Sequence, residues 1–309
     1  MRHLHARAVL CAAGLLLSVP PASAADHARA DVILEQLRDP DGPVLIVAHR
    51  GCHEHQPENS LAAFRACIRL SIDIIETDVQ HTRDGVLVIM HDQTVDRTTN
   101  GHGRVDDLTW AQLRKLRLRA GSGGPDAPVT RERIPSFEEA LAVMNGRILV
   151  DLDAKGRNLQ RVWADALQML DRRGMLNQIT VKMTAGRDDA LVPQVPLLAR
   201  VNYLQRVESG DTRLSDVVRT HAHLRPVAYP VIFSDLAYLK EGADAVKASG
   251  ARLWVEPYYD RSVAGLGDRA AASDAEGAWG VLLNAGASVL LTDEPGRLKA
   301  YLDKRPPPY

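Results

Sequence analysis

Short apolar runs recur along the chain, and most are rich in Val, Ile and Leu with no regular polar alternation. Strands that are buried on both faces of a parallel sheet show this pattern. Predicted strands cover residues 44–49, 72–79, 86–91, 148–153, 178–183, 201–207, 226–233, 252–257 and 288–293. Helical periodicity falls between most of them, in residues 60–70, 136–144, 159–170, 236–249 and 274–286. Ser136 with Glu139 predicts a capping box, and Asn59 is a predicted N-cap.

The third predicted strand does not fit an eight-stranded barrel. Only QHTRDG separates Val79 from Val86, and Asp84-Gly85 within it is a turn signal. A connection this short makes an antiparallel hairpin, because parallel neighbours need a crossover of about a dozen residues. With 86–91 as a hairpin arm, the α/β pattern predicts a TIM (β/α)8 barrel with a small insertion after the second barrel strand, at roughly residues 80–134. A doubly wound open sheet is the alternative fold.

The amino terminus has the composition of a targeting segment. Basic residues precede the apolar run AVLCAAGLLLSV, and Ala22-Ser23-Ala24 supplies a cleavage site of the A-x-A type. The apolar run is too short to span a bilayer comfortably. Residues 1–24 are therefore expected to be a cleaved signal peptide. Residues 25–309 are expected to form a single domain that is secreted or periplasmic, without a stable membrane anchor.

Composition narrows the possible partners. The 309 residues are 45% hydrophobic, which is enough for a sizeable core, and the formal net charge is −1. With a pI of about 6.8, no global field attracts nucleic acid or an anionic membrane. Export would leave Cys52 and Cys67 as the only thiols. They could pair, but one bridge adds little to a large domain, so we expect free or buried thiols. The sequence leaves the oligomeric state open.

Polar residues gather at the carboxyl ends of the predicted strands, where barrels of this type place their chemistry. Glu76 and Asp78 end the second barrel strand on the same face, because side chains alternate along a strand. Adjacent carboxylates repel each other unless one is protonated or a cation bridges them. Together with Asp153 on the third barrel strand, they predict a site for one divalent cation, Ca²⁺ or Mg²⁺. Salt-bridged strand ends are the alternative.

Other strand ends carry His49, His91, Glu256 and Asp293. A lone histidine at a strand end is more often structural than catalytic, so His49 gains its significance from its neighbours. Asp151 is expected to point into the barrel, where a buried carboxylate needs a partner, and the sequence suggests none. Four further histidines are interpreted as loop residues: His53, His55, His81 and His102.

These motifs resemble those of the glycerophosphodiester phosphodiesterase (GDPD) family. In order, the matching stretches are AHRG (48–51), PENS (57–60), ETDV (76–79), TRDGVLVIMHDQTVDRTTNGHG (82–103), IPSFEEAL (134–141), DLDAK (151–155), RLWVEP (252–257) and LLTDEP (290–295). The resemblance covers nearly all of the expected mature chain. It is strongest between residues 44 and 141 and thin between about 160 and 245.

The resemblance implies a TIM barrel with a small insertion and a division of labour within its site. Glu76, Asp78 and Asp153 would hold the divalent cation against a phosphate oxygen. His49 and His91 would be the general base and the general acid, although the resemblance does not say which is which.

Substrate contacts are implied for the residues beside this centre. Arg50 would grip the phosphate with its planar fork, and Lys155 would add a second positive contact. Glu58 would orient Arg50 or a ligand, or occupy a helix end. Trp254 lies where a sugar-like or choline group would rest, and core packing explains it equally well.

Two positions depart from the family pattern and leave the substrate open. Asp153 stands where Glu is usual, and Glu256 stands where Asn is expected. The favoured function is a secreted metal-dependent phosphodiesterase that releases an alcohol and sn-glycerol 3-phosphate from small glycerophosphodiesters. One alternative is a phospholipase D-like enzyme of the sphingomyelinase D type, which acts on lipid head groups. The other is a non-catalytic barrel that binds phosphodiesters.

Overall fold

The computed structural model describes residues 24–184, 187–188, 191–210 and 212–305, so residues 1–23 of the expected signal peptide lie outside it. The strands of this described part are β1 (Leu45–Ala48), β2 (Ile74–His81), β3 (Leu87–Ile89), β4 (Leu149–Ala154), β5 (Ile179–Thr184), β6 (Asn202–Glu208), β7 (Ala228–Ile232), β8 (Arg252–Val255) and β9 (Val289–Thr292). Each overlaps a run that the apolar pattern predicts. The predicted strands are therefore confirmed, with ends that differ by a few residues.

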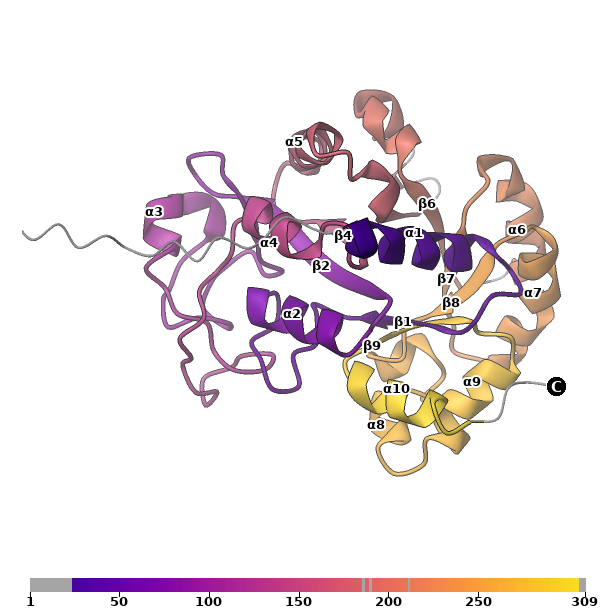
Figure 1. The fold of residues 1–309 in the computed structure, drawn as a ribbon. Coiled ribbons are helices and arrows are strands. Elements are labelled where there is room, and N and C mark those ends of the chain that lie inside the picture. Colours follow the sequence, from indigo (N-terminus) through magenta and orange to yellow (C-terminus); the bar gives the residue numbers. More distant parts are fainter. Residues whose placement is uncertain (1–23, 185–186, 189–190, 211, 306–309) are drawn as a thin grey trace, which may run out of the picture.

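Helices of the described residues fall mostly between the strands (Figure 1). They are α1 (Ala24–Arg38), α2 (Leu61–Arg69), α3 (Trp110–Leu113), α4 (Phe137–Met144), α5 (Leu159–Arg172), α6 (Leu214–His221), α7 (Leu236–Ala248), α8 (Asp268–Ala271), α9 (Val281–Asn284) and α10 (Pro295–Leu302). None of these helices is both long enough and apolar enough to cross a membrane.

The sheet closes on itself. Eight parallel strands are hydrogen bonded in the order β1, β2, β4, β5, β6, β7, β8 and β9, and β9 pairs again with β1, all within the described residues. This closure confirms the TIM barrel and excludes the open sheet, which would leave two edge strands. β3 pairs antiparallel with β2, with Val79 opposite Ile89 and His81 opposite Leu87, which confirms the hairpin arm.

The barrel interior and the insertion each contain an apolar cluster of their own. Inside the barrel, residues such as Val47, Leu204 and Trp254 pack with Ile33 and Leu37 of α1, so α1 covers one end of the barrel interior (Figure 1). The insertion has a small core of its own, made of Val88, Met90, Val95, Val105, Leu113, Leu118 and Ile134. The segment between β2 and α4 is thus a compact unit beside the barrel wall.

The helix starts are partly as predicted. Ser136 and Glu139 form the expected capping box at α4. The N-cap of α2 is Ser60, whose hydroxyl accepts the backbone N–H of Ala63, so the prediction of Asn59 was wrong by one residue. Asn59 has a φ of 53°, outside the extended region that an N-cap occupies.

The expectation of free thiols was also wrong. Cys52 and Cys67 form a disulfide, with Cα atoms 5.3 Å apart and a sequence separation of 15. The bridge ties the loop after β1 to α2. The stabilisation from this disulfide should therefore be judged against the one loop that it constrains, and not against the size of the whole domain.

Candidate active site

Three carboxylates converge at the carboxyl ends of β2 and β4. Asp78 lies opposite Asp153 in the strand register, and Glu76 lies opposite Asp151 one pleat deeper. One oxygen each from Glu76, Asp78 and Asp153 lies within 4.8 Å of the others. This oxygen-only donor set fits a hard divalent cation.

Burial makes the cluster costly without a compensating charge. Glu76 and Asp78 are both buried. Burial, reinforced by repulsion from Asp78, raises the pKa of Glu76 well above its ordinary value. Burial would also raise the pKa of Asp78, but Lys155, His91 and Arg50 outweigh it and lower that pKa. The arrangement therefore favours a bound cation.

A short polar network holds these carboxylates in place. The Asn59 amide donates to Asp78 Oδ2 over 2.8 Å and accepts from the Thr77 hydroxyl over 2.7 Å. The backbone N–H of Arg50 donates to Glu76 Oε2 over 2.8 Å. Arg50 and Asn59 both have a φ of 53°, a left-handed conformation that non-glycine residues seldom adopt. Such strain is often found where the backbone must serve a site.

Two predicted phosphate contacts lie beside the cluster. The Arg50 guanidinium is 3.7 Å from Asp78 Oδ2 and donates to Glu58 over 3.0 Å. Lys155 Nζ is 2.7 Å from Asp153 and 3.3 Å from Asp78. Burial would lower the pKa of Lys155, but Asp78 and Asp153 hold it above its usual range. Both side chains therefore stay cationic beside the three carboxylates.

Glu58 orients two arginines. It is buried, and its two oxygens accept from Arg50 and Arg97. Of the three roles considered for Glu58, the structure supports the one toward Arg50, and a contact with substrate stays a prediction. The expected ligand contact of Trp254 is corrected, because its side chain has no exposed surface and packs in the barrel core.

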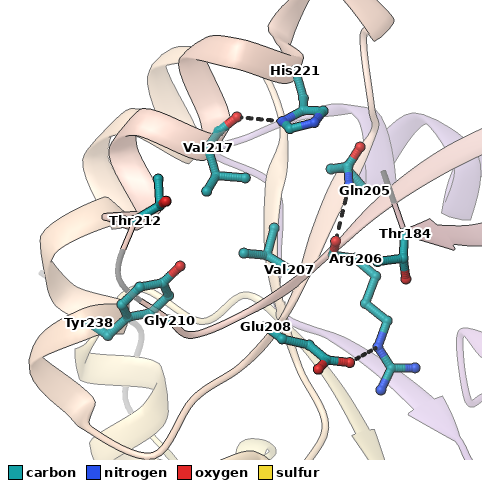
Figure 2. Close-up of a pocket in the computed structure, with 10 residues that line it drawn as sticks. All are labelled: Thr184, Gln205, Arg206, Val207, Glu208, Gly210, Thr212, Val217, His221 and Tyr238. Atoms are coloured by element: carbon teal, nitrogen blue, oxygen red, sulfur yellow. Dashed lines mark hydrogen bonds and ion pairs between the residues drawn. The ribbon is translucent and has the colours of Figure 1, made fainter. Parts of the chain in front are cut away.

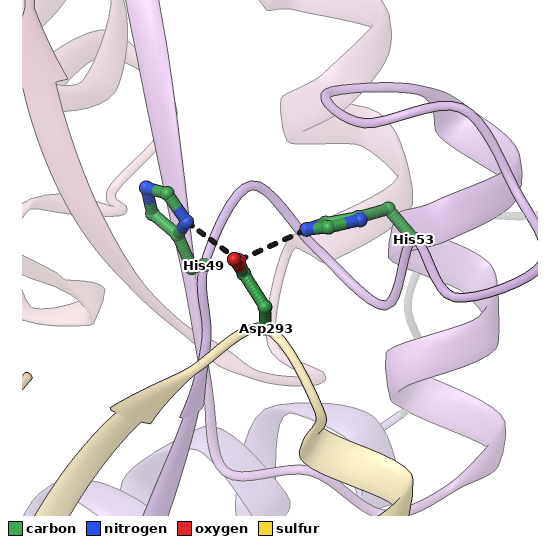
Figure 3. A group of neighbouring side chains, drawn as sticks. All are labelled: His49, His53 and Asp293. Atoms are coloured by element: carbon green, nitrogen blue, oxygen red, sulfur yellow. Dashed lines mark hydrogen bonds and ion pairs between the residues drawn. The ribbon is translucent and has the colours of Figure 1, made fainter. Parts of the chain in front are cut away.

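His49 is held on two sides. Its Nδ1 is 2.7 Å from Asp293 Oδ1 (Figure 3). Its ring also stacks on Tyr258, with the ring centroids 4.0 Å apart. Burial lowers the pKa of His49, and Asp293 offsets that effect only in part. A hydrogen bond from Nδ1 to Asp293 leaves Nε2 of the neutral ring free to accept a proton.

His91 has a similar carboxylate partner on the insertion. Its Nδ1 is 2.7 Å from Asp92 Oδ1, and Arg97 donates to both oxygens of Asp92. His91 follows β3, so the two histidines reach the carboxylate cluster from separate parts of the chain. Both histidines interact with Asp78. The Asp78 carboxylate partly offsets the lowering of the His49 pKa, and the charge of His91 helps to lower the pKa of Asp78.

A cavity of about 500 Å³ opens beside His91. It is lined by His91, Asp92, Gln93, Ala154, Lys155, Gly156 and Leu159. A second cavity of about 240 Å³ lies where β6 meets α6 and α7 (Figure 2). Its described lining includes Arg206, Glu208 and Tyr238 and contains no predicted site residue. The cavity beside His91 thus brings together two of the predicted residues, His91 and Lys155.

Sequence reasoning missed three residues that the structure brings to the site. Asp293 was noted as a strand end without a role, and His53 was interpreted as a loop residue. His53 is buried, and its Nε2 is 3.1 Å from Asp293 Oδ1. Lys182 on β5 is the missing partner of Asp151, with Nζ 2.6 Å from Asp151 Oδ2 and 3.7 Å from Glu256 Oε1.

Known sequences share these motifs over part of their length. The glycerophosphodiester phosphodiesterase of Caldanaerobacter subterraneus is 44% identical over 112 residues, which cover 36% of this chain and 45% of that protein. The human glycerophosphodiester phosphodiesterase 1 is 40% identical over 126 residues, which cover 39% of this chain and 37% of that protein. The match thus spans less than half the length of these curated relatives.

Solved structures share the fold over most of the chain. A glycerophosphoryl diester phosphodiesterase from Parabacteroides distasonis has a TM-score of 0.72 at 21% identity, covering 91% of this chain and 93% of that one. A phosphodiesterase from Oleispira antarctica, solved with the product sn-glycerol-3-phosphate, has a TM-score of 0.64 at 22% identity, covering 85% and 98%. The sequence model of the glycerophosphoryl diester phosphodiesterase family matches residues 49–296, and this chain therefore belongs to that family.

Proposed function

We propose that the chain hydrolyses small glycerophosphodiesters to an alcohol and sn-glycerol 3-phosphate, with Ca²⁺ or Mg²⁺ as its cofactor. The observation that carries the proposal is the pair of histidines, each tied to a carboxylate through Nδ1 and each close to Asp78 of the acidic cluster. A protein that only binds phosphodiesters needs no such pair of proton-transfer groups.

His49 is suited to be the general base. Its lowered pKa favours the neutral ring near pH 7, and Asp293 holds the proton on Nδ1, so that Nε2 can take a proton from the nucleophile. His91 lines the cavity and would return a proton from its own Nε2 to the departing alcohol oxygen. Asp92 and Asp293 thereby orient the two rings and stabilise their charged forms.

Arg50 and Lys155 are proposed to bind the phosphate. Glu58 fixes the guanidinium of Arg50, so the cost of ordering this long side chain is met before substrate arrives. Glu76, Asp78 and Asp153 would hold a divalent cation, which would polarise a phosphate oxygen and offset the charge that develops on it. The same carboxylates keep Lys155 cationic near the cavity.

We also propose that the mature protein is secreted or periplasmic. The support is the targeting pattern of residues 1–24 together with the disulfide between Cys52 and Cys67, because disulfides persist mainly in oxidising compartments.

The proposal is tested with the mature protein, glycerophosphocholine and sphingomyelin, each assayed with added Ca²⁺ or Mg²⁺ and with a chelator. We expect sn-glycerol 3-phosphate from glycerophosphocholine only when cation is present. If sphingomyelin is hydrolysed and glycerophosphocholine is not, the lipid head-group activity would replace the proposed one. No product from either substrate under any condition would overturn the enzymatic assignment.

A further inference from the structure

Two imidazoles and one carboxylate meet at a point outside the acidic cluster. His49 Nδ1 and His53 Nε2 both approach the same atom, Asp293 Oδ1, at 2.7 and 3.1 Å (Figure 3). Their ligand atoms all lie within 4.8 Å of one another. We propose that His49, His53 and Asp293 form a second cation site, selective for a borderline ion such as Zn²⁺, and that its occupation inhibits the enzyme.

The donor atoms separate this site from the acidic cluster. Ca²⁺ and Mg²⁺ prefer oxygen ligands, which the acidic cluster supplies, whereas two imidazole nitrogens with one carboxylate are a common Zn²⁺ set that leaves a fourth position open. A tetrahedral Zn²⁺ with bonds of about 2.0–2.1 Å needs ligand atoms roughly 3.3 Å apart. Asp293 Oδ1 is 2.7 Å from His49 Nδ1 and 3.1 Å from His53 Nε2, about 0.6 and 0.2 Å short of that spacing, so the side chains must rotate slightly apart as the ion enters.

The three ligands are already in position before any ion arrives. His53 follows Cys52 directly, so the disulfide to α2 fixes the loop that carries it. The backbone N–H of Asp293 donates to Asp268 over 2.8 Å, and Tyr258 stacks on the His49 ring. The Asp293 side chain is 37% exposed, which gives an ion from solvent a path to the site. Preorganised ligands lower the entropic cost of binding.

Inhibition follows from the position of one proton. In the hydrogen-bonded arrangement, His49 carries its proton on Nδ1 and leaves Nε2 free. A cation on Nδ1 uses the lone pair there, and the proton of the neutral His49 ring moves to Nε2. The proton that His53 donates from Nε2 moves to its own Nδ1 or is released to solvent, so that Nε2 of His53 can bind the ion. The His49 nitrogen proposed as the general base then has no lone pair to accept a proton, although Asp293 and the acidic cluster remain intact.

Calorimetry tests the site without reference to catalysis. Zn²⁺ is titrated into the mature protein saturated with Ca²⁺ or Mg²⁺, and we expect one additional Zn²⁺ to bind. His53→Gln should weaken this binding roughly a hundredfold or more. His102→Gln is the matched control, because His102 is an exposed histidine that pairs with Asp96 and should leave Zn²⁺ affinity unchanged. Equal affinity in the wild type and His53→Gln would overturn the proposal.

Inhibition is the second measurement, and this arm rests on the proposed phosphodiesterase activity. Rates with Zn²⁺ are compared with the zinc-free rate of the same variant, at rising concentrations of Ca²⁺ or Mg²⁺. We expect inhibition of the wild type that excess activating cation does not reverse, and little inhibition of His53→Gln. Reversal by excess cation would place Zn²⁺ at the acidic cluster and refute inhibition through His49. An inactive protein would refute the proposed function but leave the calorimetric result to decide the site.

Discussion

Replacement of Lys182 by Met tests how the inside of the barrel balances its charge. Lys182 Nζ is 2.6 Å from Asp151 and 3.7 Å from Glu256, and their side chains are 12%, 0% and 2% exposed. Burial alone would lower the pKa of Lys182, but the two carboxylates hold it above its ordinary value, so the residue is charged. Met has a similar length and no charge, so the variant leaves two buried carboxylates without their partner.

The size of the effect follows from these distances. At an effective dielectric constant of about 20, the two attractions are roughly 6 and 4 kcal/mol before desolvation is counted. Most of this is offset by the cost of burying the charges, but removal of one partner from a buried pair still costs about 3–5 kcal/mol. For a chain of this size, each kcal/mol lowers Tm by roughly 2–4 °C, so we expect a fall of about 6–20 °C.

Urea denaturation and thermal unfolding at pH 7 measure this loss. Lys247→Met is the matched control, because Lys247 pairs with Asp41 on the surface and should contribute at most about 1 kcal/mol. Combining Lys182→Met with Asp151→Asn and Glu256→Gln removes the uncompensated charges and should restore part of the stability. The reasoning is refuted if Lys182→Met stays within about 1 kcal/mol of the wild type, or if the triple variant is no more stable than the single one.

Four further outcomes are expected. His49→Ala and His91→Ala should each lower kcat by roughly a hundredfold or more with an unchanged circular dichroism spectrum, and full activity in either would contradict its role. Asp153→Ala should raise the cation concentration needed for half-maximal activity, whereas an unchanged requirement would place the third ligand elsewhere. Reduction of the disulfide should lower unfolding stability by about 3 kcal/mol, since it closes a loop of 15 residues, and an unchanged urea midpoint would argue against that estimate. Hydrogen bonds from His49 and His53 outweigh burial and lower the pKa of Asp293, so its stabilising contribution is present above about pH 4 and is lost as the pH falls. The stability of Asp293→Asn should therefore change less than that of the wild type between about pH 5 and 3, and parallel curves would show otherwise.

The barrel was predictable because its strands are buried on both faces and its helices separate them. The short link between Val79 and Val86 identified the hairpin arm, since no parallel crossover fits such a length. The period of two along a strand also placed Glu76 and Asp78 on one face. These features depend only on residues that are close together in the sequence, so the sequence alone predicts them.

Contacts between strands were not predictable in the same way. Asp151 lies opposite Thr180, so Lys182, two residues further along β5, reaches it only in that register. Ala48 lies opposite Thr292, and this register places His49 beside Asp293. No spacing within the chain encodes which residues of two distant strands become neighbours.

Two further differences between prediction and structure, at Asn59 and Trp254, follow from where the backbone directs each side chain. Asn59 has the composition of an N-cap, but its left-handed φ turns its amide toward Asp78 and leaves the cap to Ser60. The aromatic ring of Trp254 suggested either a contact with a sugar-like or choline group or core packing, and its place on β8 directs it into the barrel core. Residue type alone does not distinguish these two outcomes.

The two proposed proton-transfer groups lie on separate segments of the chain. His49 directly follows barrel strand β1, and the acidic cluster lies on β2 and β4. His91 instead follows β3 and lies in the insertion, which has its own apolar core. Recombination that exchanged the stretch between β2 and α4 would transplant His91 and one wall of the adjoining cavity while the cation-binding half stayed as it is. Under the proposed function, preference for the departing alcohol would change when this segment is exchanged, while the eight-stranded barrel stays the same.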